Sequence, residues 1–262
     1  MIDIHSHILH GLDDGAKDLS ESLEMARMAV NDGVVAMVAT PHMMPDGPMA
    51  NRRDAAMERL AVLQEALSRE EIPLRVLPGG EVYISPDIPA ELARGSLLTC
   101  ADRGTHVLVE FPAGEIPHYA EQVFFECQLR KIVPVIAHPE RNVRELEDYE
   151  RLVEWIRRGL LLQVNGRSLL GESGSGAQKA ARTIIERRMA HFVASDAHST
   201  TRRPPGLSAA RREVERLVGD AVAKILFEDN PRRLIEGGNI HVWEPAPPVR
   251  RGLLHRLLGR SS

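Results

Sequence analysis

Short apolar segments rich in β-branched residues alternate with amphipathic, helix-forming segments along most of the chain. Residues 19–33 show the helical pattern, because their apolar side chains repeat at helical spacing and Gly33 can end the helix in a left-handed turn. Strands that alternate with helices favour parallel pairing through helical crossovers. The predicted strands are residues 2–4, 34–39, 74–77, 106–109, 132–137, 160–164 and 192–194. About seven such units predict an α/β fold, and a barrel rather than an open sheet.

Length and composition limit the remaining possibilities. A chain of 262 residues accommodates one barrel or two modest domains, and we expect a single domain over residues 1–243. The net charge of -4 disfavours broad nucleic-acid binding. No apolar run of about 18 residues and no signal-peptide pattern occurs, so we expect a cytoplasmic protein. Cys100 and Cys127 form no close metal or redox motif, which agrees with a reducing compartment.

Imidazoles and carboxylates follow most of the predicted strands. In a parallel barrel, the carboxyl ends of all strands meet at one rim, where active sites lie. This ligand set without thiolates suits Zn, Mn, Fe or Co rather than a cysteine-bound structural zinc. The alternative is that these side chains only cap helices and fill polar gaps. The residues at these positions are His5, His7, His42, Glu81, Glu110, His138, Asn165, Asp196 and His198.

Two pairs of these residues have the spacing of an extended strand. One residue separates His5 from His7, and one separates Asp196 from His198. Since residues i and i+2 of a strand point to the same side, each pair can converge on one ion. A third early histidine, His10, lies outside this spacing, and we expect it to be an exposed loop residue.

A series of motifs resembles a known family. HSHILHGLDDGAKD, ATPH, GGEVYISPD, VLVEFP, VIAHPER, QVNGRSLLG, ASDAH and RRPP occur in this order. Together they resemble the polymerase-and-histidinol-phosphatase (PHP) superfamily. They are most similar to its bacterial protein-tyrosine phosphatase branch, which is linked to capsular and exopolysaccharide synthesis. The resemblance runs over residues 1–239 and implies a distorted seven-stranded (β/α)7 barrel.

The resemblance also implies a metal centre with three divalent ions, most often Mn²⁺, with Zn²⁺, Fe²⁺ or Co²⁺ as alternatives. Arg141 and Arg203 match arginines that bind phosphate in this branch, and Asn165 is expected to support the site. The implied ligands are His5, His7, Glu81 and Asp196 for one ion; Glu81, Glu110 and His138 for a second; and His42 and His198, helped by Asp14 directly or through water, for the third.

The implied reaction is hydrolysis of phosphotyrosine by a metal-activated hydroxide. The leaving phenolate would take a proton from water or from Asp14. A thiol mechanism is not expected, because it needs a cysteine, five residues and then an arginine. The residues at that spacing after Cys100 and Cys127 are His106 and Val133. The glycine-rich segment 171–176 lacks the Lys-Ser/Thr of a phosphate-binding loop and is predicted to be a flexible loop.

Residues 244–262 are predicted to form a linker and a basic tail. The leucines of 250–262 share one helical face, a pattern typical of a helix at a membrane surface or in a partner groove; a self-docked tail is the alternative. Membrane contact would suit the substrate that the resemblance implies, a membrane-anchored tyrosine autokinase.

Three other functions stay open at this point. The first is a small-molecule phosphatase acting, for example, on histidinol phosphate. The second is a non-catalytic metal-binding scaffold, in which loss of ligands would be expected. The third, a phosphodiesterase or exonuclease, is disfavoured by the acidic net charge.

Overall fold

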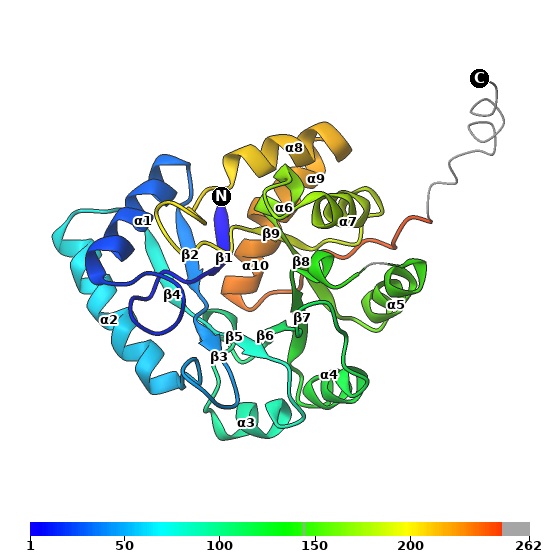
Figure 1. Cartoon of the computed structure of the whole chain (residues 1–262), viewed down its shortest axis with the longest axis horizontal. Coiled ribbons are helices and arrows are strands. Elements are labelled where there is room, and N and C mark those ends of the chain that lie inside the picture. Colours follow the sequence, from blue (N-terminus) through cyan, green and yellow to red (C-terminus); the bar gives the residue numbers. More distant parts are fainter. Residues whose placement is uncertain (144, 248–262) are drawn as a thin grey trace.

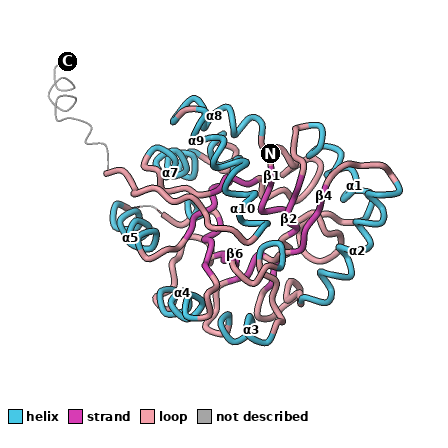
Figure 2. Tube along the Cα trace, turned by 180° about the vertical axis from the view of Figure 1, so that it is seen from behind, coloured by secondary structure: helices cyan, strands magenta, loops and turns pink. Residues whose placement is uncertain are grey.

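The computed structural model describes residues 1–143 and 145–247. The predicted amphipathic tail, residues 250–262, lies outside these described residues. The strands occupy the middle of the molecule and the helices surround them (Figures 1 and 2). In the order of the chain, the strands are β1 (Ile2–Ser6), β2 (Ala36–Ala39), β3 (His42–Met43), β4 (Arg75–Pro78), β5 (Glu81–Tyr83), β6 (His106–Glu110), β7 (Val133–Ala137), β8 (Leu161–Asn165) and β9 (Phe192–Ala194).

The strands form two parallel sheets. One has the order β1-β2-β4, and the other has the order β3-β5-β6-β7-β8-β9. Ser6 at the end of β1 bridges to Ala197 just after β9, which connects the two sheets on one side. The prediction of an α/β fold with parallel strands is confirmed, although the described strands pair as two sheets rather than as one continuous ring.

Two predicted strands are each followed, after a break of two residues, by a second short strand that was not predicted. Pro41 lies between β2 and β3, and proline has no N–H for the strand ladder. Gly79 and Gly80 lie between β4 and β5. A Cβ atom at Gly79 would come within 2.6 Å of Val38 Cγ1, and one at Gly80 would come within 2.5 Å of Met43 Sδ. His42 and Glu81 therefore begin short strands of their own instead of following longer ones.

A β-bulge in β1 changes the direction of its side chains. Ile2 pairs with Ala36 and Asp3 with Met37, but Ser6 pairs with Ala39, so β1 holds one extra residue. In a regular strand, Ile4 and His5 would point to opposite sides. The bulge lets Ile4 join the inner hydrophobic cluster while His5 still reaches the carboxyl ends of the strands.

The helices cover the outside of the sheets. The predicted segment at 19–33 forms α1, and Gly33 has the left-handed φ of +88° expected at the end of α1. The helices are α1 (Leu19–Asn31), α2 (Arg53–Arg69), α3 (Ile88–Arg94), α4 (Ala120–Leu129), α5 (Leu146–Arg157), α6 (Gly166–Leu170), α7 (Ser175–Glu186), α8 (Ser208–Val218), α9 (Asp220–Lys224) and α10 (Asn230–Glu236), with short turns η1 (Cys100–Asp102), η2 (Pro139–Arg141) and the π-helical η3 (Ile225–Asp229).

Two hydrophobic clusters hold these layers together. The larger one joins the outer faces of the strands to the helices. The smaller one joins residues from β1, β2 and β6–β9, such as Ile4, Leu108 and Phe192, to Leu234 and Ile235 of α10. Among the described helices, none is long and apolar enough to cross a membrane.

The start of the predicted linker packs against the domain. Glu244 Oε1 accepts hydrogen bonds from Arg157, and the Ala246 N–H donates to the Arg187 carbonyl over 2.8 Å. Residues 244–246 are thus held beside α5 and α7.

Candidate metal centre

The strand-end residues predicted from the sequence lie together at one rim of the strands. β1 and the residue after it supply His5 and His7, β3 supplies His42, and β5 supplies Glu81. The ends of β6, β7 and β9 supply the others: Glu110, His138, Asp196 and His198. Within this set and Asp14, the structure contains three groups whose nitrogen and oxygen atoms are close enough to hold one ion each: His5, His7 and Glu81; His42, Glu81 and Glu110; and His7, Asp14, His42 and His198.

The innermost group is fully buried. The Nε2 atoms of His5 and His7 lie 3.3 Å apart. Glu81 Oε2 lies 3.3 Å from His5 Nε2 and 3.2 Å from His7 Nε2. Asp196 Oδ1 approaches the same two nitrogens at 3.4 Å and 3.5 Å.

The orientation of both imidazoles makes this arrangement informative. His5 Nδ1 lies 2.9 Å from Gln163 Oε1, and His7 Nδ1 lies 2.8 Å from Asp13 Oδ2. Since both oxygens accept hydrogen bonds, each Nδ1 carries the proton and each Nε2 presents a lone pair. Two lone pairs and two carboxylate oxygens therefore face one another in the neutral form of the histidines, and either a bound cation or protonation of the imidazoles relieves the repulsion.

The distances also fit a metal ion. Ligands of a tetrahedral Zn²⁺ site bind at about 2.1 Å, so they lie about 3.4 Å from one another. The contacts of 3.2–3.5 Å among His5, His7, Glu81 and Asp196 match this spacing. The residues present therefore fit a divalent ion.

Glu81 extends the cluster to a second group. Its Oε1 lies 2.9 Å from His138 Nε2, and its Oε2 lies 3.2 Å from His42 Nδ1. Glu110 lies 3.7 Å from His138 Nε2 and 3.6 Å from His42 Nδ1. The geometry thus brings His42 to this group in addition to His138, which the family resemblance implied with Glu81 and Glu110.

Asp14 completes a third group at the outer side. Its Oδ1 lies 3.3 Å from His198 Nε2 and 3.5 Å from His42 Nε2. The His7 and His198 rings stack with centroids 3.7 Å apart. His10 takes part in none of the three groups and lies in a loop, as expected, but it is half-buried rather than exposed.

Two of these residues have strained backbones. His138 and Asp196 have positive φ angles of 31° and 53°. A non-glycine residue in this region costs about 1–3 kcal/mol and persists only where the surroundings hold it. The Asp196 N–H donates to the His5 carbonyl over 2.9 Å, which ties this bend to β1.

A chain of amides connects Asp196 to His5. Asn165 Nδ2 donates to Asp196 Oδ2 over 2.8 Å, and Gln163 Nε2 donates to Asn165 Oδ1 over 2.8 Å. Gln163 Oε1 is then left to accept from His5 Nδ1. Asn165 thus supports the site, as expected, whereas the role of Gln163 was not predicted from the sequence. The available signal was an inward-facing polar residue two positions before Asn165 in an otherwise apolar strand.

Asp13 is the second residue that was missed. Its carboxylate accepts from His7 Nδ1 and also from the N–H groups of Gly15 and His42 over 2.9 Å each. Gly15 is required there, because a Cβ atom would lie 2.2 Å from the His7 carbonyl oxygen. Asp13 therefore orients one candidate ligand and fixes the loop that carries Asp14.

The two predicted phosphate-binding arginines border the cluster. Arg141 Nη2 donates to Asp196 Oδ2 over 2.6 Å. Arg203 Nη2 donates to Asp14 Oδ2 over 2.8 Å, and Arg203 Nη1 lies 3.7 Å from Asp196 Oδ2. Both guanidinium groups are partly exposed, so they can present further donors to an incoming anion.

The electrostatics of the buried groups follow from this crowding. Burial opposes charge on Glu81, but His5 and His138 outweigh it and hold the pKa of Glu81 well below its usual range. Burial also opposes charge on His5, but the carboxylates of Glu81 and Asp196 outweigh it and raise the pKa of His5 to about 9. Burial and the charge of Glu81 raise the pKa of Glu110 to about 7. Hydrogen bonds from His198 and His42 lower the pKa of Asp14.

Both cysteines are buried and take no part in the site. Burial raises the pKa of Cys100 to about 12 and that of Cys127 to about 11, so both thiols stay protonated at neutral pH. This agrees with the sequence-based exclusion of a thiol mechanism.

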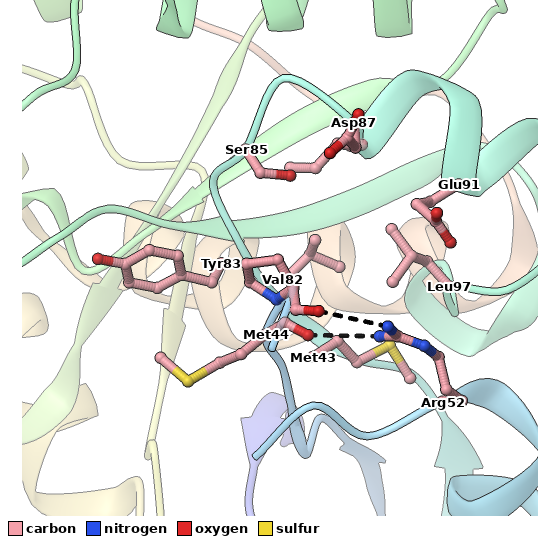
Figure 3. Close-up of a pocket in the computed structure, with 11 residues that line it drawn as sticks. Met43, Met44, Arg52, Val82, Tyr83, Ser85, Asp87, Glu91 and Leu97 are labelled. Carbon is pink, nitrogen blue, oxygen red and sulfur yellow. Dashed lines mark hydrogen bonds between the residues drawn. The ribbon is translucent and has the colours of Figure 1, made fainter. Parts of the chain in front are cut away.

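A small pocket of about 80 Å³ is lined by the residues that come directly after His42 in β3 and after Glu81 in β5 (Figure 3). Met43 and Val82 line it, and Arg52 closes one side by donating to the carbonyl oxygens of Met44 and Pro45. Tyr83 lies on the opposite side from Arg52 (Figure 3). Tyr83 thus also lines this pocket.

Comparison with known proteins gives a consistent picture. The tyrosine-protein phosphatase YwqE of Bacillus subtilis is 39% identical over 253 residues, which is 97% of this chain and 98% of that protein. A chain from the crystal structures of YwqE and of CpsB from Streptococcus pneumoniae, described as metal-dependent tyrosine phosphatases, has a TM-score of 0.89 at 38% identity and covers 95% of this chain and 100% of that one. Histidinol phosphate phosphatase from Lactococcus lactis, crystallised with zinc, has a TM-score of 0.54 at 13% identity over 86% of this chain and 94% of that one, which shows a shared fold alone.

The same relationship appears at the level of the family. A family model described as capsular polysaccharide synthesis, CpsB/CapC, matches residues 1–236. This match spans every strand of the fold and all the candidate ligands. The chain therefore belongs to the CpsB/CapC family of capsular polysaccharide synthesis proteins.

Proposed function

We propose that this chain is a metal-dependent phosphatase that hydrolyses phosphotyrosine on a bacterial tyrosine autokinase of capsular or exopolysaccharide synthesis. The observation that carries the proposal is the meeting of the His5 and His7 lone pairs with Glu81 and Asp196. Relatives named tyrosine-protein phosphatases, at up to 39% identity over nearly the whole chain, support the substrate class.

We assign the ligands of three divalent ions, with Mn²⁺ as the first choice, to the predicted rim residues. His5, His7, Glu81 and Asp196 would hold one ion, Glu81, Glu110 and His138 a second, and His42, His198 and Asp14 the third. The contact of His42 with Glu81 and Glu110 also lets it complete the second. When bound, the ions would supply an activated hydroxide and positive charge against the phosphate oxygens.

The chain itself supplies orientation and further positive charge. Arg141 and Arg203 flank the cluster and would bind the phosphate oxygens that the ions leave free. Their present partners, Asp196 and Asp14, keep both guanidinium groups in place before substrate arrives. Arginine charge in this position favours the transition state, in which negative charge spreads over the equatorial oxygens.

The protonation state of Asp14 bears on the leaving group. Its lowered pKa means that Asp14 is a carboxylate at neutral pH, without a proton to donate. We therefore favour water over Asp14 as the proton source for the phenolate, whose parent pKa of about 10 already makes it a fair leaving group.

The cellular setting is part of the proposal. We propose that the protein acts in the cytoplasm and meets its kinase at the inner face of the membrane. Contact through residues 250–262 stays a prediction. Liposome co-sedimentation of the full chain and of a chain lacking these residues tests it, and equal binding would contradict it.

The function is tested by metal analysis together with a substrate panel. Purified protein is assayed on a tyrosine-phosphorylated kinase tail and on histidinol phosphate, before and after chelation. We expect metal-dependent activity that favours the kinase tail. His7→Ala should lose bound metal and activity, whereas His10→Ala, the matched control outside the cluster, should keep both. Full activity after chelation or in folded His7→Ala would refute the mechanism, and preference for histidinol phosphate would refute the substrate.

A further inference from the structure

A cleft of about 620 Å³ opens beside Arg141, next to the metal centre but built from other residues. Its walls come from η2, α5, the loop before α7 and the exposed face of α7 itself. The residues that define it are Arg141, Tyr149, Gly176, Ala177, Lys179 and Thr183. Arg141 belongs to both places, because its guanidinium also donates to Asp196 over 2.6 Å. Arg141 thus links the cleft to the candidate metal centre.

The glycine-rich segment 171–176 forms one edge of this cleft, although the metal centre makes no use of it. Gly176 lies within the first turn of α7, where its φ is not in the left-handed region. A Cβ atom at Gly176 would meet nothing within 4 Å. Neither backbone conformation nor packing in this chain therefore requires a glycine at this position. A missing side chain at the edge of a cleft allows another backbone to approach closely.

The charge in the cleft selects its occupant. Lys179 is exposed, and no carboxylate among the described residues lies within 4 Å of its ammonium group. Arg141 adds a second cation at the end nearer to the metal centre. The carboxyl group of Glu140 also lines the cleft, but it is buried and accepts from the Asn165 N–H over 3.0 Å. Between Lys179 and Arg141 lie the small apolar side chains of Ala177 and the buried Ala180, together with the aromatic ring of Tyr149. The hydroxyl of Thr183 already donates to the Lys179 carbonyl oxygen over 2.8 Å. Such a surface fits an extended polypeptide that carries an acidic side chain.

We propose that this cleft, the Arg141 cleft, binds the segment of the substrate protein next to the phosphotyrosine. This inference rests on the proposed function and specifies it further. A volume of about 620 Å³ is in the range of sites that hold ligands larger than one side chain. The phosphotyrosine would enter the metal centre beyond Arg141, the neighbouring backbone would pass Gly176, and an acidic side chain would reach Lys179.

The test compares a peptide with a small aryl phosphate. The peptide has a central phosphotyrosine flanked by acidic residues on both sides, a second peptide carries lysines instead, and para-nitrophenyl phosphate reports the metal centre alone. Gly176→Phe fills the cleft, and Gly176→Ala is the matched control that removes the glycine without filling it. Replacing a helical glycine favours helix formation, so both variants are expected to fold.

We expect Gly176→Phe to raise KM for the acidic peptide about tenfold and to leave kcat/KM for para-nitrophenyl phosphate within about twofold. The unaltered protein should prefer the acidic peptide over the lysine peptide. Lys179→Glu should reverse this preference, and Lys179→Arg should keep it.

The outcomes separate the two proposals. If the unaltered protein hydrolyses the acidic peptide but Gly176→Phe and Lys179→Glu leave its KM unchanged, the cleft is not a substrate site, and the proposed function stands. If the unaltered protein hydrolyses para-nitrophenyl phosphate but neither peptide, the proposed function fails, and this inference fails with it.

Discussion

Gln163 decides which nitrogen of His5 carries the proton. Asp196 can only accept hydrogen bonds, so Asn165 must donate to it and must present its carbonyl oxygen to Gln163. Gln163 then presents its own carbonyl oxygen to His5 Nδ1 and leaves the Nε2 lone pair free for a metal. The donor quality of a candidate ligand is therefore set by residues that touch no ion.

The first prediction concerns this amide chain. Gln163→Leu removes the acceptor for His5 Nδ1 and should weaken metal binding about 10-fold or more, as loss of such partners usually does. Gln163→Glu keeps an acceptor and should lose less. Competition with a chromogenic chelator measures the affinity, and nitrogen NMR of His5 reports its tautomer. Equal affinity for Gln163→Leu and the unaltered protein would show that the amide chain is dispensable.

His191 makes the stability of the fold depend on pH. It is fully buried, its Nδ1 accepts from the Leu162 N–H over 3.0 Å, and burial lowers its pKa to about 3. The ordinary pKa of about 6.5 applies in the unfolded chain. Between these two pKa values the unfolded state binds more protons than the folded state. The free energy of unfolding is therefore unaffected by His191 above about pH 6.5 and falls as the pH decreases towards 3.

The second prediction isolates this effect. From pH 6.5 downwards, His191 should cost about 1.4 kcal/mol of unfolding free energy per pH unit. His191→Gln, which can still accept from Leu162, should show a shallower loss between pH 7 and pH 5. Urea unfolding of the chelated proteins measures the difference between the two slopes, and parallel slopes would contradict the assignment.

At the scale of elements, the connection between β1 and the turn after β9 depends on one buried carboxylate. Asp3 Oδ1 accepts from the Ser195 N–H over 3.1 Å, and its Oδ2 accepts from Ser195 Oγ over 2.5 Å. Ser195 in turn accepts from the Ala197 N–H, so Asp3 fixes the backbone on both sides of Asp196. The strained bend at Asp196 is thus held from β1.

The third prediction follows from this connection. Asp3→Ala leaves the Ser195 and His5 N–H groups without an acceptor and should cost about 2–4 kcal/mol of unfolding free energy. Asp3→Asn keeps one carbonyl oxygen and should cost less. Urea unfolding of chelated protein compares them, and the idea is wrong if Asp3→Ala unfolds at the same urea concentration as the unaltered chain.

The elements also show where sequence reasoning succeeds and where it stops. The rim residues could be predicted because parallel strands bring their carboxyl ends to one edge, whatever their exact bounds. The bulge in β1 could not, since apolar alternation gives Ile2 and Ile4 one direction and says nothing of one extra residue. Pro41, Gly79 and Gly80 are residue types that often end strands. Whether they end one here depends on contacts with the neighbouring strand, which the sequence does not give.

Residues that act through another side chain were the hardest to foresee. Asp13 stands beside Asp14 in the sequence, and nothing local tells which of the two faces His7. Their difference arises from Gly15, which lets the loop fold against the His7 backbone. Three-dimensional contact, rather than residue type, separates the orienting aspartate from the candidate ligand.

At the scale of the whole molecule, the fourth prediction concerns metal removal. The cluster joins β1, β3, β5 and the ends of β6, β7 and β9, so bound ions would cross-link most of the fold. At a free metal concentration of about 100 times Kd, each ion adds about 2.7 kcal/mol. For a chain of this size, loading should raise Tm by about 5 °C or more.

Thermal unfolding with and without chelator measures this shift. His7→Ala should show a clearly smaller increase on metal addition, and His10→Ala should behave like the unaltered protein. A Tm that is the same in chelator and in excess Mn²⁺ or Zn²⁺ would count against a bound metal centre.

The connection between β1 and the turn after β9 is made by Asp3 and Ser195, which lie 192 positions apart in the sequence. During translation, His5 and His7 leave the ribosome long before Asp196 and His198 exist. The growing chain therefore cannot build the complete proposed site, and a metal can be selected only after nearly all of the domain has been synthesised and folded. Because divalent ions compete according to availability as well as affinity, the ion that occupies the centre would reflect the metals present in the cell when folding finishes. Protein made in hosts or media of different metal supply should then carry different ions on the same polypeptide.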